Sequence, residues 1–247
     1  MKRKIILLPA LLITLSLGFS ACQKDSSDNP ATGNSSLGIK LQALNKNVTL
    51  PGAKSSSTTS ILVWDTARMI VSQVKFEAEM KQANTSHDSI EIEFKWNGPM
   101  EINLLDINVT LGNFTLLPGF YDEIELKVEG LKKDAGNKPV FYLSGVYSKT
   151  DGTLVPIVFT VNENVVFKTE KNNVEVTPDI SVFTSTILLY LDELLLDVQI
   201  SDLENAALTN GVIVISDNSN SDLYDIIMHN LYKDHHSEHG HHHGQGH

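Results

Sequence analysis

Cysteine is almost absent from this chain. Cys22 is the only one among 247 residues, so no disulfide can form within a single molecule. A folded domain must therefore be held together by its core, which is feasible at this length. The place of Cys22 is informative, because an apolar segment ends there and a polar one begins.

Positive charge is also scarce. The chain has 19 Lys and Arg against 30 Asp and Glu, a net charge of −11. Such a surface repels nucleic acid and anionic lipid, and this argues against both as partners. The motifs Gly-x-Ser-x-Gly and His-Glu-x-x-His and a phosphate-binding glycine loop are all missing. A Ser-His-Asp triad would have to use His87, so we expect no enzymatic activity and no catalytic residues.

Only one long apolar run is present, and it lies at the N-terminus. Lys2, Arg3 and Lys4 precede an apolar stretch from Ile5 to Leu17, and mostly small residues follow up to Ala21. This is typical of a secretory signal peptide over residues 1–21. The run is too short to span a bilayer, which takes roughly 20 apolar residues. Removing 21 residues leaves 226, and losing three basic side chains takes the net charge from −11 to −14.

The residues around Cys22 carry a family resemblance. Phe19-Ser20-Ala21-Cys22 resembles the lipobox of bacterial lipoproteins, although that family usually has Leu where Phe19 stands. The resemblance implies cleavage before Cys22, lipid on Cys22 and a membrane partner through that lipid, stable because several acyl chains are attached. Gln23-Lys24-Asp25 resembles the export signal of Bacteroidetes lipoproteins. It implies the outer membrane, facing the periplasm or, as the favoured alternative, the cell surface.

The middle of the chain predicts β structure. Residues 22–37 are polar and predict a lipidated flexible tether. Residues 38–216 contain many short segments of alternating polarity, for example Ile90, Ile92 and Phe94 among charged neighbours. We therefore expect a mainly β protein, an antiparallel β-sandwich with short C-terminal helices and a disordered histidine-rich tail. Polar residues 171–172 predict a hairpin turn, and Ser201 predicts a capping box that starts a short helix ended by Asn210-Gly211.

A second resemblance covers residues 69–198. Leu117-Pro118-Gly119-Phe120-Tyr121, which leads into Ile124-Glu125-Leu126, is similar to a segment of a domain family of unknown function common in Bacteroidetes lipoproteins. That family usually shows Pro-x-Gly-x-Tyr, and this chain is one residue tighter. The resemblance implies a β-sandwich in a lipoprotein, and it implies no catalytic residues.

The C-terminus holds the candidate metal ligands. Residues 217–234 predict a helix with an apolar stripe, and residues 235–247 form a histidine-rich tail. Seven of the nine histidines lie in that tail: His235, His236, His239, His241, His242, His243 and His247. His229, with Asp225 one helical turn before it, is a further candidate ligand. Neutral imidazole suits Zn, Ni, Cu and Co, so a divalent transition metal is the expected cofactor or cargo.

Two functions follow from these observations. The first is a non-enzymatic cell-envelope lipoprotein whose histidine-rich tail captures or buffers divalent transition metal. The second is a surface module for binding or assembly with a glycan or an envelope protein, to which the tail is incidental. Trp64, Trp96, Tyr142 and Tyr147 would line a sugar platform if they were exposed, although the alternation places Trp96 on the apolar face.

Overall fold

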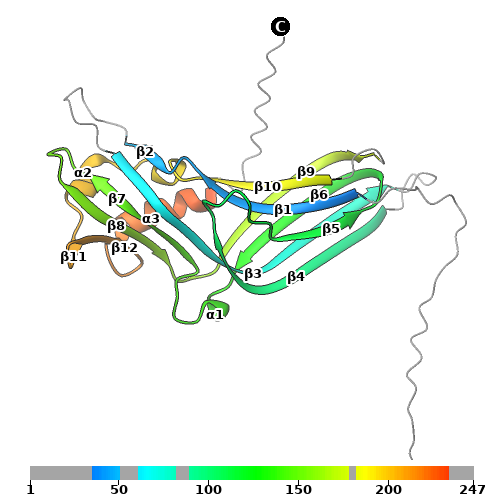
Figure 1. Cartoon of the computed structure of the whole chain (residues 1–247), viewed down its shortest axis with the longest axis horizontal. Helices are drawn as coiled ribbons and strands as arrows, with labels where there is room; N and C mark the ends of the chain where they lie inside the picture. The colour runs from blue at the N-terminus through cyan, green and yellow to red at the C-terminus, as the bar shows by residue number, and fades with distance from the viewer. Residues whose placement is uncertain (1–34, 51–60, 82–88, 178–181, 234–247) are drawn as a thin grey trace, which may run out of the picture. The chain divides into compact units, whose positions relative to one another are not determined.

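A computed structural model describes residues 35–50, 61–81, 89–177 and 182–233. It confirms the predicted mainly β fold, with two sheets and short helices that lie mostly toward the C-terminus (Figure 1). The predicted signal peptide, Cys22, His87 and the tail from His235 lie outside the described residues. No helix in the described ranges is long and apolar enough to cross a bilayer.

The larger sheet has nine strands and the smaller has three. The nine are β2 (Asn47–Thr49), β3 (Ile61–Lys81), β4 (Ser89–Asn103), β6 (Gly119–Gly130), β7 (Phe141–Ser148), β8 (Leu154–Val161), β9 (Val165–Val176), β11 (Leu208–Thr209) and β12 (Val212–Ile215). The three are β1 (Ser35–Leu44), β5 (Gly112–Leu116) and β10 (Val182–Tyr190). The helices are α1 (Lys132–Ala135), the 3-10 helix η1 (Glu193–Leu195), α2 (Ile200–Glu204) and α3 (Ser221–Lys233).

The 21-residue strand β3 is the spine of the larger sheet. Its first half pairs with β7 and its second half with β6. Opposite these partners, β2 pairs with its start and β4 with its second half. At Arg68 and Met69 both β4 and β7 pair with β3, so β6 and β7 share one edge of the spine. Strand β3 thereby joins two half-sheets. One contains β2, β7, β8, β12 and β11, and the other contains β4, β6 and β9.

Two bulges in β3 keep one face in the core. The pairing register shifts between Trp64 and Thr66 and again between Val71 and Gln73. At the first shift β3 carries the extra residue, Asp65, and at the second the longer segment lies in β4; at both places the parity that points inward in β3 changes. Buried positions accordingly move from even numbers at the start of β3, to odd at Ala67, Met69 and Val71, and back to even from Val74.

The core lies between the larger sheet and a second layer. At one end β1, β5 and β10 cover β3, β4, β6 and β9, and Phe114 of β5 lies 4.5 Å from Phe76 of β3, measured between ring centroids. At the other end α3 packs on β8 and β12, with Tyr224 at 5.8 Å from Phe159. The apolar stripe predicted for α3 is confirmed, because Leu223, Ile227 and Leu231 are buried.

Several local expectations differ from the structure. The hairpin expected around residues 171–172 is wrong: β9 continues through them, paired with β6, and its polar side chains there are exposed. Asn210-Gly211 does not end a helix. Both residues have positive φ, 53° and 81°, and they form the turn of the β11–β12 hairpin.

Three further differences concern element boundaries and direction. The capping box of α2 is formed by Gln199 with Asp202, so the helix begins before Ser201. Strand β1 begins at Ser35, inside the expected tether, because Leu37 is buried. Most strand pairs are antiparallel as expected, but β1 pairs parallel with β10 and β12 parallel with β8.

Asn230 fixes α3 to the preceding chain. Its side chain is 3 % exposed, and Nδ2 donates hydrogen bonds to the carbonyl oxygens of Leu194 (3.1 Å) and Leu196 (2.7 Å) in and after η1. These carbonyls lie at the end of a short helix, where no intrahelical donor is left for them. The pair of hydrogen bonds therefore sets the position of the helix that leads into the histidine-rich tail.

We predict that Asn230→Ala lowers the free energy of unfolding by about 1–3 kcal/mol, because it leaves two buried acceptors without a donor. Urea denaturation followed by circular dichroism measures the change. Asp225→Ala, at an exposed position on the same helix, serves as the control and should change stability by less than about 0.5 kcal/mol. Equal effects of the two substitutions would contradict the role of Asn230.

Candidate functional site

Asp225 and His229 are the described members of the predicted metal-binding set. Both are exposed on α3, one turn apart, on the side of the helix away from the buried stripe. Two ligands at positions i and i+4 of a helix lie on one face and are spaced for chelation. Within the described residues, no group of three or more potential metal ligands includes His229. The seven tail histidines lie beyond Lys233, the last residue that the structure describes.

The aromatic platform considered for glycan binding is not present as a row. Trp64 and Tyr147 are 1 % and 0 % exposed, so both belong to the core. Trp96 is partly buried against the same core, as the alternation of its strand predicts. Tyr142 lies on the outer face, where the guanidinium of Arg68 stacks on its ring at 4.5 Å.

The structure also contains a charged feature that sequence reasoning missed. On the outer face of β4, β3, β6 and β9, like charges stand directly opposite one another across neighbouring strands, and we call this surface the charged face. One row consists of Lys95, Lys75, Lys127 and Lys168. The next consists of Glu93, Glu77, Glu125 and Glu170, and a third of Glu91, Glu79 and Glu123.

Like charges placed directly opposite each other destabilise a sheet. Here the lysine row offsets part of the cost. The Nζ atom of Lys168 lies 2.8 Å from Glu125 and 3.5 Å from Glu170, and Glu129 lies 3.9 Å from Lys75 and 3.7 Å from Lys127. Within the described ranges, no ion pair reaches the third row. These glutamates line a hollow on the outer face together with Glu77, Glu93 and Glu125.

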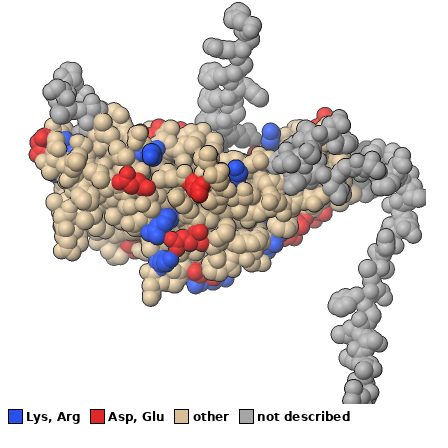
Figure 2. All heavy atoms as spheres, in the orientation of Figure 1, with Lys and Arg blue, Asp and Glu red and all other residues tan. Residues whose placement is uncertain are grey.

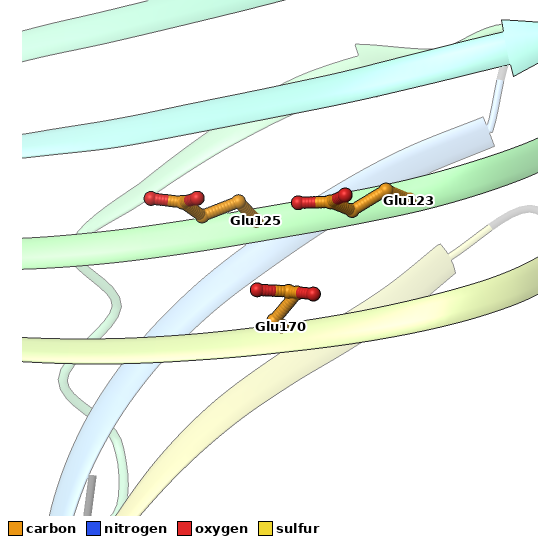
Figure 3. Close-up of side chains that lie close together, drawn as sticks. All are labelled: Glu123, Glu125 and Glu170. Atoms are coloured by element: carbon orange, nitrogen blue, oxygen red, sulfur yellow. The ribbon is translucent and has the colours of Figure 1, made fainter. Parts of the chain in front are cut away.

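Three of these carboxylates lie close enough to share a cation. Glu123 and Glu125 of β6 and Glu170 of β9 each offer an oxygen within 4.8 Å of the others (Figure 3). Carboxylate oxygens are the ligands that Ca²⁺ prefers. However, the ammonium group of Lys168 already contacts Glu125 and Glu170. The protein thus supplies a cation of its own to this cluster, and the geometry is that of a partly neutralised surface.

The charges on the neighbouring strands shift two pKa values. The charge of Glu170 raises the pKa of Glu123, and desolvation and the charges of Glu79 and Glu125 add to the effect. The hydrogen bond to Glu125 raises the pKa of Lys168. The folded state therefore binds the Glu123 proton more tightly than the unfolded chain does. Ionised Glu123 lowers the stability of the fold at neutral pH, and this penalty disappears as the pH falls through its pKa.

We predict that Glu123→Gln raises Tm at pH 7 by roughly 1–3 °C, the scale expected for removing a like-charge cross-strand pair. The gain should shrink when the pH is lowered to about 4, where the glutamate becomes protonated. Differential scanning calorimetry across this pH range measures both effects. Glu175→Gln removes the same charge from an exposed position of β9 and is the control; the same gain in that variant would contradict the local origin of the strain.

Comparison with known proteins adds no relative to these observations. The sequence matches no family model and no curated protein, and the fold matches no solved structure. The resemblances of Phe19–Cys22 and of Leu117–Tyr121 remain predictions. In the structure, the hydroxyl group of the buried Tyr121 donates a 2.7 Å hydrogen bond to the carbonyl of Leu117 and closes the turn between β5 and β6.

Proposed function

We propose that this protein is a non-enzymatic, lipid-anchored protein of the outer membrane that captures divalent transition metal through its histidine-rich C-terminus. The observation that carries the proposal is the position of Asp225 and His229. They form an exposed ligand pair on α3, and the segment with seven histidines begins two residues after that helix ends. The helix thus presents two ligands next to a chain that carries many more.

The attachment of α3 supports this arrangement. Its buried side chains pack on β8 and β12, and Asn230 holds it to η1. The exposed pair is therefore presented from a fixed helix, and less conformational entropy is lost when it binds than for ligands on a free chain. Imidazole ligands from residues 235–247 would then complete the coordination of Zn²⁺, Ni²⁺, Cu²⁺ or Co²⁺.

Metal titration tests the proposal. Isothermal titration calorimetry with Zn²⁺ and with Ni²⁺ compares residues 23–247, the same chain ending at residue 234, and the double variant Asp225→Ala/His229→Ala. Truncation should remove most of the bound metal, and the double variant should weaken the tightest site about tenfold. Because ligation requires neutral imidazole, binding should fade below about pH 6.

Two controls make the titration decisive. Asp222→Ala removes an exposed carboxylate from the first turn of α3 and should leave the affinity unchanged. Circular dichroism checks that each variant is folded. Equal stoichiometry and affinity in the full-length and truncated chains would contradict metal capture by the tail.

Anchoring by lipid has a separate test. We predict that Cys22→Ser moves the protein expressed in a Gram-negative host from the membrane fraction to the soluble fraction. Mass spectrometry of the unmodified protein should show cleavage before Cys22 and the added mass of acyl chains. Ser27→Thr, a conservative change outside Phe19–Cys22, is the control. An unacylated Cys22 in the membrane-bound protein would contradict the assignment.

The second candidate function is an assembly module that binds another protein. It is favoured by the uncharged outer surface of β7, β8 and β12 in the larger sheet. A glycan site receives less support, because Trp64 and Tyr147 are buried.

A further inference from the structure

The other half of the larger sheet, formed by the start of β3 with β7, β8 and β12, has a very different outer surface from the charged face. Strands β7, β8 and β12 contain no charged residue, and Ile61–Thr66 of β3 contains only Asp65. Their outward side chains include the small uncharged residues Ser144, Ser148 and Pro156, and six aliphatic ones: Ile61, Val63, Val146, Leu154, Val158 and Val214. We call these six residues the aliphatic face. In Figure 2 the lower left part of the domain, where β8 and β12 lie in Figure 1, is almost free of charged side chains.

The strand pairing joins these side chains into one uncharged surface. Val63 of β3 stands opposite Val146 of β7, which in turn stands opposite Pro156 of β8. In the adjacent row, Val158 of β8 stands between Val214 of β12 and Ser144 of β7. Directly opposite residues have Cβ atoms about 5 Å apart, so neighbouring side chains touch. Leu154 is 68 % exposed and Ile61 is 39 % exposed. The alternating residues on the inner face, such as Ile157 and Ile213, are fully buried, so the outer chains are not needed to fill the core.

We propose that the aliphatic face is the interface of a homodimer, in which it packs against the same face of a second copy. Contiguous exposed apolar patches of this kind mark interaction surfaces. A two-fold interface brings each residue near its own copy, so charges close to the axis repel. In a chain with a net charge of −11, three consecutive sheet strands without any charge meet that requirement, whereas the charged face would oppose it.

The shape and size of the face fit a second copy. A face of β-branched side chains on paired strands is flat enough to pack on another sheet at about 10 Å separation, as in β-sandwiches. Four strands and three to four rows of outward residues span on the order of 500 Å² per copy. Two copies would bury about 1,000 Å², which is at the lower limit for a specific interface. The dimer is therefore expected to have a dissociation constant in the micromolar range.

Sedimentation velocity of residues 23–247 tests the inference, since this chain contains every residue that the structure describes. The unmodified chain should pass from monomer to dimer between about 1 and 200 µM. Val158→Lys should weaken the dimer about a hundredfold or more, because it buries an unpaired charge in the interface. Leu154→Lys, at a position so exposed that folding cannot depend on it, should weaken the dimer in the same direction.

Controls separate the aliphatic face from the other surfaces. Asn97→Lys adds the same charge to an exposed strand position on the charged face and should leave the dimer intact. The dimer should also persist in about 1 M NaCl, which screens contacts between charged groups. Circular dichroism and Tm verify that each variant is folded. Residues 23–234 should dimerise equally well in the absence of metal, so failure of the metal-capture proposal would leave this one standing.

Four results would overturn the proposal. A chain that remains monomeric up to 200 µM has no such dimer. A dimer that survives both Val158→Lys and Leu154→Lys uses another surface. A dimer that dissociates in high salt, or in Asn97→Lys alone, is held by the charged face. A monomer that sediments with zwitterionic phospholipid vesicles, and loses that binding in Leu154→Lys, uses the aliphatic face for lipid.

Discussion

The continuity of β3 is the constraint on which the rest of the structure depends. One strand serves two half-sheets, so a single backbone carries hydrogen bonds to β7 and β2 at one end and to β6 and β4 at the other. The least exposed residues of β3 are even-numbered at its start, odd-numbered in its middle and even-numbered again at its end. A regular strand alternates with a period of two, so without the two bulges the core residues of the middle would face solvent. The bulges allow Leu62, Met69 and Phe76 all to point into the core, although their sequence numbers do not share a parity.

The shared spine also explains why one sheet has two outer surfaces of opposite chemistry. Both halves are covered on the inside, by α3 at one end and by the small sheet at the other, so the inner faces are largely apolar. The outer faces are free to differ. One presents lysine and glutamate rows and the other valine and leucine, and the division falls at the second bulge near Ser72. There Arg68 and Lys138 pair with Glu101 at the border between the two.

Local pattern predicted most elements, and long-range pairing accounts for what it missed. Alternation predicted the β structure of residues 38–216, including the segment that forms β4, and helical spacing predicted α3, because these signals belong to a single segment. The turn predicted at residues 171–172 is wrong because a run of exposed polar side chains in β9 resembles a loop when the pairing with β6 is not known. Asn210-Gly211 was assigned to a helix end although it is a strong hairpin signal. Asp225 and His229 were found as an exposed pair, whereas the charged rows were not. Their signal was nonetheless present: Lys-x-Glu-x-Glu at Lys75–Glu79 is repeated in reverse at Glu91–Lys95 and Glu123–Lys127, so antiparallel pairing aligns like charges.

The charged rows show that the sheet is held in a register that its own surface disfavours. Sliding β6 along β3 by two residues in one direction would bring Lys75 opposite Glu125, and in the other direction Glu77 opposite Lys127. Either slip would replace part of the repulsion on the outside by attraction, with one glutamate pair left in each case, Glu77 opposite Glu123 or Glu79 opposite Glu125. Neither is adopted, so the choice of register must come from inside, where Phe76 and Tyr121 are fully buried and the bulges fit only one alignment. In this protein the shape of the core, rather than the pairing of surface charges, selects the partner for each residue.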